Sequence, residues 1–135
     1  MAKKKRVLFL CIGNICRSPM AEAMARTYGS DVLEVQSAGL QPAMNTSTYT
    51  RNVLTEKNIH LGDHLPRRFR DLNLTDFDLI VNLSGSKLPG SLATPVENWN
   101  VDDPFGGTED DFRAARERIE MLVMNLILRV RTGKI

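Results

Sequence analysis

The sequence predicts an α/β protein built on one doubly wound sheet of about four parallel strands with helices on both faces. Short apolar runs alternate along the chain with segments in which apolar residues recur at helical spacing. The first run, residues 6–10, is apolar throughout after its arginine, which is typical of a strand buried on both faces of a parallel sheet. At 135 residues the chain suits one hydrophobic core, so we expect a single domain over residues 1–135.

The remaining elements follow in order from periodicity and from helix-end signals. Ser18 can cap a first helix with Pro19 in its first turn and Gly29 at its end. Thr108 with Asp111 is similar to a capping box at the start of a strongly amphipathic last helix. Further strands are expected at residues 31–36, 77–83 and 95–100, and a second helix at 46–58. The basic segment 65–72 has no periodicity and is predicted to be a loop.

Composition excludes several classes of protein. With 42% hydrophobic and 25% charged residues, the chain is typical of soluble globular proteins rather than disordered or membrane proteins. The net charge is only +2, and the lysines near the N-terminus are interpreted as a flexible basic leader, residues 1–5, rather than a nucleic-acid arm. No membrane or secretory segment is predicted, and a reactive cysteine favours the reducing cytoplasm. We expect no cofactor and no metal, and the oligomeric state stays open.

The segment CIGNICRS, residues 11–18, follows the first strand and precedes the first helix. A cysteine followed six positions later by an arginine lets the backbone between them curl around a tetrahedral anion, with its amides and the positive helix end facing inward. The same groups favour the Cys11 thiolate, a nucleophile. The Arg17 guanidinium can bind two phosphoryl oxygens at once. The predicted phosphate-binding residues are Ile12, Gly13, Asn14, Ile15, Cys16, Arg17 and Ser18.

Thiolate attack on a phosphomonoester also requires an acid that protonates the departing oxygen. Asp102 and Asp103 are the candidates. Pro104 restricts the backbone of the residue before it, so we choose Asp103.

The segment CIGNICRSPMAEA resembles the opening of the low-molecular-weight protein tyrosine phosphatases, a superfamily shared with the thioredoxin-coupled arsenate reductases. QSAGLQP, TDFDLIV and VDDPFGGTEDDF are similar to further family landmarks and occur in the family's order. The resemblance also places the general acid immediately before the proline. It implies hydrolysis of protein phosphotyrosine, or of a small phosphomonoester, through a cysteinyl-phosphate intermediate.

The resemblance further implies supporting roles. Asn14 would stabilise the unusual backbone of the loop, and the Ser18 hydroxyl would stabilise the departing thiolate. Ser37 and His64 would join the same hydrogen bonds. Cys16 would protect Cys11 through a reversible disulfide, although it can equally fill apolar space. Phe105 would form one wall of the substrate pocket.

The chain also departs from the tyrosine phosphatase pattern. The acidic residue usual after the third strand is missing from VNLSGSK, the wall segment LQPAMN is short and carries no aromatic residue, and glycines follow Phe105. These departures predict a weaker hydrogen-bond network around the loop and fewer aromatic side chains beside the phenyl ring of a substrate.

Other functions stay open. An arsenate reductase of this fold relays its disulfide through two further cysteines, which this chain lacks, so an external thiol would have to serve. DPFGG resembles the phosphoarginine phosphatases, but Ile15 is typical of the tyrosine branch. A noncatalytic oxyanion-binding module would have no use for both Cys11 and Asp103.

Overall fold

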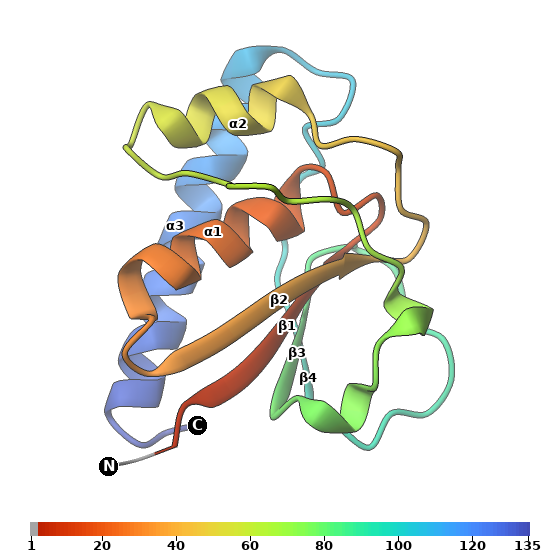
Figure 1. Ribbon diagram of the computed structural model, residues 1–135, viewed down its shortest axis with the longest axis vertical. Coiled ribbons are helices and arrows are strands. Elements are labelled where there is room, and N and C mark those ends of the chain that lie inside the picture. Colours follow the sequence, from red (N-terminus) through yellow and green to blue (C-terminus); the bar gives the residue numbers. More distant parts are fainter. Residues whose placement is uncertain (1–2) are drawn as a thin grey trace.

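Four parallel strands form the centre of the molecule, in the order β2-β1-β3-β4 (Figure 1). The computed structural model describes residues 3–135. The strands are β1 (Lys5–Cys11), β2 (Leu33–Gly39), β3 (Leu79–Asn82) and β4 (Val96–Asn98). The sheet confirms the predicted fold class, and β1 lies inside it, between β2 and β3.

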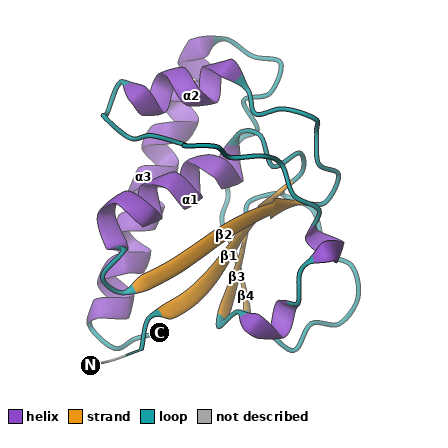
Figure 2. Cartoon of the chain, viewed as in Figure 1, coloured by secondary structure: helices purple, strands orange, loops and turns teal. Residues whose placement is uncertain are grey.

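Helices cover the two faces of the sheet unequally (Figure 2). The three α-helices are α1 (Arg17–Gly29), α2 (Thr48–Thr55) and α3 (Glu109–Arg131). Helices α1 and α3 pack together on one face, and α2 packs mainly on α3. The other face is covered by loops and two short 3-10 helices, η1 (Phe69–Asp71) and η2 (Leu74–Asp76). The predicted loop at residues 65–72 therefore contains a helical turn, which is too short to show a period in the sequence.

Strand β1 is buried on both sides, as its apolar run predicts. Val7 and Phe9 belong to the cluster beneath the α-helices, whereas Leu8 and Leu10 belong to the cluster beneath η1 and η2. Because side chains alternate along a strand, one uninterrupted apolar run serves both faces. The strand that ends at Cys11 is thus buried from Val7 to Cys11.

The long helix α3 carries the predicted capping box. The Thr108 hydroxyl accepts a hydrogen bond from the Asp111 N–H at 3.3 Å, and the Asp111 carboxylate accepts one from the Thr108 N–H at 2.8 Å. Trp99 is 5% exposed and packs against Phe9, so it is part of the core.

Two expectations were wrong. Lys5 belongs to β1 rather than to a flexible leader, because parallel pairing with Leu33 extends β1 by one residue. Residues 1 and 2 of the leader lie outside the described residues. Ser18 does not cap α1, which begins at Arg17, because its hydroxyl is directed toward Cys11. No helix in the described part of the chain combines the length and the hydropathy that crossing a membrane requires.

Candidate active site

The loop of residues 11–16 connects the carboxyl end of β1 to the N-terminus of α1. Asn14 adopts a left-handed backbone conformation, with φ of 56°. Gly39, at the end of β2, lies against this loop so closely that a Cβ there would come within 2.7 Å of the Ile12 carbonyl oxygen and 2.9 Å of the Asn14 nitrogen. A glycine is therefore required for β2 to support the loop at this point.

Every carbonyl of the loop is bound from outside. Backbone N–H groups of Leu40, Gln41 and Ala43 donate to the carbonyls of Cys11, Ile12 and Gly13 at 2.8–3.1 Å. Three further contacts are His64 Nε2 with Asn14 O (3.0 Å), Thr50 Oγ1 with Ile15 O (2.8 Å) and Met20 N with Cys16 O (3.2 Å).

In a trans peptide the N–H points away from the C=O, so six outward carbonyls imply six inward amides, those of residues 12–17. Among residues 3–135 these amides have no hydrogen-bond acceptor. The loop thus forms a nest of donors at a helix N-terminus, suited to a tetrahedral anion.

Arg17 is buried beside this nest. Its Nη1 donates to the Val101 carbonyl at 3.1 Å, and its Nη2 lies 3.3 Å from Oδ2 of Asp103. Its Nε is the one buried side-chain nitrogen or oxygen among residues 3–135 that has no hydrogen-bond partner. An unsatisfied buried N–H of a cation is costly, and an anionic oxygen would satisfy it.

A chain of hydrogen bonds leads from the Cys11 sulfur into the interior. The Asn14 Oδ1 accepts from the Arg67 N–H at 2.8 Å, which fixes the orientation of the Asn14 amide. Its Nδ2 then donates to the hydroxyls of Ser18 and Ser37, each at 2.9 Å. Since Ser18 Oγ accepts there, its own hydrogen is free for Cys11 Sγ, 2.9 Å away, whereas the Ala38 carbonyl lies at 3.4 Å.

Glu22 anchors the far end of this chain. Its carboxylate accepts from the Ser37 hydroxyl and from Arg26, and it lies 3.6 Å from Nδ1 of His64. Burial alone would raise the pKa of Glu22, but bonds from His64, Ser37 and Arg26 outweigh burial and hold the pKa below its usual value. The buried carboxylate is thus ionised at neutral pH.

Sequence reasoning missed Glu22. The signal was its position on α1 one turn after Ser18, on the face that also carries the loop's hydroxyl. The structure places Asn14, Ser18, Ser37 and His64 in one group of hydrogen bonds, which also includes Glu22.

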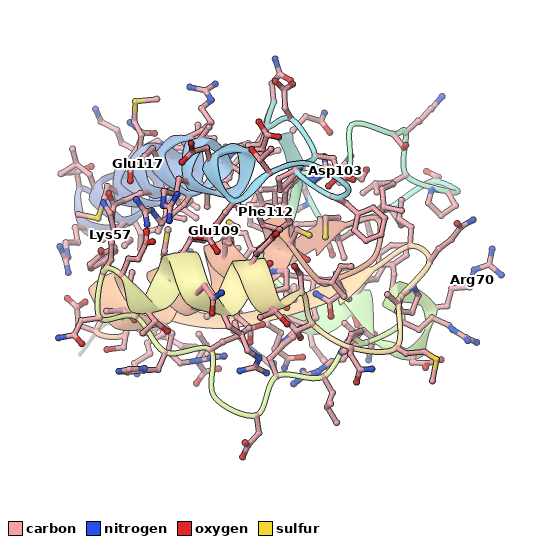
Figure 3. All side chains as sticks on the ribbon, turned by 90° about the horizontal axis from the view of Figure 1, so that it is seen from above. Lys57, Arg70, Asp103, Glu109, Phe112 and Glu117 are labelled. Atoms are coloured by element: carbon pink, nitrogen blue, oxygen red, sulfur yellow. The ribbon has the colours of Figure 1, made fainter. Side chains whose placement is uncertain are left out.

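Of the two adjacent aspartates, Asp103 lines the cavity over Cys11 and Asp102 does not. Asp103 faces the cavity above Cys11, and its Oδ1 accepts from the Phe105 N–H at 3.1 Å. Asp102 lines, together with Asp103, a neighbouring hollow beside Arg118. Figure 3 shows Asp103 on the loop that precedes α3. Only one of the two candidate acids therefore adjoins Cys11 and Arg17.

The cavity over the loop has a volume of about 200 Å³. Phe105, 68% exposed, lines this cavity. Gln41 and Ala43, from the wall segment LQPAMN, also line it, together with Ile12 and Ile15. The cavity is thus narrow and mainly apolar above its polar floor.

Cys16 is buried and lines the same cavity. Burial raises the pKa of its thiol to about 12, although a hydrogen bond with Thr50 opposes that rise. Cys16 is therefore a protonated thiol at neutral pH.

The expected acid after β3 is replaced by a turn in which Asn82 Oδ1 accepts from the Ser84 N–H and hydroxyl. Residues 3–135 contain no cluster of three or more histidine, cysteine or acidic side chains that could hold a metal ion.

Comparison with known proteins agrees with the fold and the loop. The family model described as low molecular weight phosphotyrosine protein phosphatase matches residues 6–134. A glutaredoxin arsenate reductase of Synechocystis sp. is 32% identical, over 93% of this chain and 98% of the relative. A low molecular weight phosphotyrosine protein phosphatase of Schizosaccharomyces pombe is 33% identical, over 83% and 88%.

Among solved structures, an arsenate reductase in the phosphate binding state superposes with a TM-score of 0.87. It is 31% identical, with 93% of this chain and 98% of that chain covered. The chain belongs to the low molecular weight phosphotyrosine protein phosphatase family, whose members include relatives named as phosphatases and relatives named as arsenate reductases.

Proposed function

We propose that this protein hydrolyses phosphomonoesters, with phosphotyrosine in proteins as the substrate class, through a cysteinyl-phosphate intermediate. One observation carries the proposal: Cys11 lies on the floor of a cavity that combines inward amides, an unpaired Arg17 Nε and the Asp103 carboxyl group. The apolar walls and Phe105 suit an aromatic leaving group.

In the first step the Cys11 thiolate attacks phosphorus and the bond from phosphorus to the leaving oxygen breaks. The protonated Asp103 gives its proton to that oxygen, so a phenol departs. The inward amides and Arg17 stabilise the charge that develops on the equatorial oxygens.

In the second step water attacks the cysteinyl phosphate, and the Asp103 carboxylate takes the proton of the water. The Cys11 sulfur leaves as a thiolate, which the Ser18 hydroxyl stabilises at 2.9 Å. Neither step needs a cofactor, because water and the side chains of Cys11 and Asp103 supply every atom and proton that is transferred. They require a reduced thiolate, which suits a reducing compartment such as the cytoplasm.

Arsenate reduction is the second candidate, because the Synechocystis relative bears that name. Once Cys11 has formed a sulfur–arsenic bond with arsenate, a second thiol must attack the Cys11 sulfur, which releases arsenite and forms a disulfide, and a third thiol must then reduce that disulfide. The chain holds only Cys11 and Cys16, and Cys16 is buried. An external thiol would therefore have to complete the reaction.

The deciding experiment compares both reactions in one preparation. p-Nitrophenyl phosphate turnover is measured across pH, and arsenate reduction is measured with glutathione, thioredoxin and dithiothreitol as separate reductants. We expect phosphatase turnover that is abolished by Cys11→Ser, since a hydroxyl is a far poorer nucleophile than a thiolate. A kcat/KM for arsenate with any of these thiols above that for p-nitrophenyl phosphate would overturn the proposal.

A further inference from the structure

One buried hydroxyl from outside the loop bonds directly to the loop backbone. Thr50, on α2, is fully buried, and its Oγ1 donates to the Ile15 carbonyl at 2.8 Å across 35 residues of sequence. The other buried residues of α2, Val53 and Leu54, are apolar. Thr50 is thus the polar contact between α2 and the anion-binding loop.

The hydrogen bond from Thr50 to the Ile15 carbonyl controls the direction of the Cys16 N–H. The Ile15 carbonyl and the Cys16 N–H belong to one planar peptide unit and point in opposite directions. The loop carbonyls before Asn14 are held by backbone N–H groups, which every residue other than proline supplies. The Ile15 carbonyl depends on one side chain. Without that donor, the carbonyl is buried unsatisfied and the Cys16 N–H is no longer held toward the anion.

Helix α2 is itself firmly placed against α3. Lys57 lies in the turn just after α2 and Glu117 lies on α3 (Figure 3), and Lys57 Nζ is 3.4 Å from Glu117 and 2.6 Å from Glu120. At the other end of α2 the Tyr49 ring packs edge-on against Phe112, with ring centroids 5.2 Å apart. The Thr50 hydroxyl therefore projects from a helix fixed near both ends.

We propose that Thr50 is a positioning residue, whose hydroxyl holds the Ile15–Cys16 peptide so that the Cys16 amide faces the bound anion. It acts on the loop rather than on the reacting atoms. The inference rests on the proposed function only in that the loop must bind a phosphate-like anion.

The test compares Thr50→Val, which keeps the shape but removes the donor, with Thr50→Ser, which keeps the donor. The matched control is Thr55→Val on the same helix, because the Thr55 hydroxyl bonds to the Arg51 carbonyl and not to the loop. Two quantities are measured: the affinity for inorganic phosphate by calorimetry, and the pH profile of Cys11 alkylation by iodoacetamide.

Thr50→Val should weaken phosphate binding by about tenfold, the effect of losing one hydrogen bond to a charged ligand, and shift the alkylation profile to higher pH. Thr50→Ser should stay within about threefold of wild type, and Thr55→Val should match wild type. If Thr50→Val does not fold, Thr50→Ala is measured in its place.

Phosphate binding within about twofold of wild type in the donor-free variant would overturn the role of Thr50. Equal weakening in Thr50→Ser would also overturn it, because shape rather than the hydroxyl would then matter. A wild-type chain that binds no phosphate would instead overturn the proposed function.

Discussion

Arg17 and Asp103 face each other across the candidate active site, with Nη2 of the guanidinium 3.3 Å from Oδ2 of the carboxylate. The Arg17 side chain is 5% exposed and that of Asp103 is 44% exposed. The arginine thus belongs to the floor of the site and the aspartate to its solvent-facing rim. This separation suits a fixed anion clamp and a group that exchanges protons with a leaving group and with water.

If Asp103 is the general acid, Asp103→Asn should slow phenyl phosphate by on the order of a hundredfold or more, and p-nitrophenyl phosphate less, because p-nitrophenoxide leaves without a proton. The dependence of the rate on leaving-group pKa is the measurement. Asp102→Asn is the matched control, since it makes the same charge change on a neighbouring residue that does not line the cavity over Cys11. Equal losses in both variants for every ester would remove Asp103 from this role.

Arg17→Lys should reduce kcat/KM by about a hundredfold or more, because an ammonium cannot present two N–H groups to two phosphoryl oxygens. It also removes the donor to the Val101 carbonyl. Phosphate inhibition should weaken in parallel with turnover, which steady-state kinetics can check. Wild-type kinetics in this variant would contradict the clamp.

Peroxide should inactivate the enzyme reversibly. The Cys11 thiolate is oxidised to a sulfenic acid, and the Cys16 thiol then displaces water to form a disulfide. Because Cys16 stays protonated at neutral pH, oxidation begins at Cys11 and Cys16 acts second. Peptide mass spectrometry identifies the cross-link, and dithiothreitol should restore activity.

Cys16→Ala is the control for this oxidation. It should lose activity to peroxide irreversibly, through sulfinic acid at Cys11. Full recovery of the oxidised Cys16→Ala variant with dithiothreitol would leave Cys16 with a packing role only.

Glu22→Gln should destabilise the fold by about 1–3 kcal/mol at neutral pH, because a buried carboxylate that accepts several bonds is replaced by a neutral amide. The pKa of Glu22 is lowered in the folded state. Its stabilisation is therefore present above the ordinary glutamate pKa and is lost as pH falls through the folded-state value.

The stability difference between wild type and Glu22→Gln should accordingly shrink below about pH 4. Urea unfolding at several pH values measures it. A difference that does not change with pH would contradict an ionised Glu22.

Local patterns predicted much of this molecule. The apolar run of β1, the period of α3 and the cysteine-to-arginine spacing each depend on residues close in sequence, which periodicity and spacing can report. Glu22 and Thr50 escaped prediction because their partners, Ser37 and Ile15, lie 15 and 35 residues away. Only the helix-cap prediction for Ser18 was wrong, because its hydroxyl lies 2.9 Å from Cys11 Sγ and the helix already begins at Arg17.

The buried Nε of Arg17 has no hydrogen-bond acceptor among residues 3–135. A buried donor without an acceptor costs about 1–3 kcal/mol, and an anion in the cavity removes that cost. If the loop binds phosphate as proposed, inorganic phosphate should stabilise the folded state, and the melting temperature should rise with its concentration. A phosphate ion bound in the cavity would then have two effects: it would stabilise the fold against unfolding, and it would block the binding of a substrate.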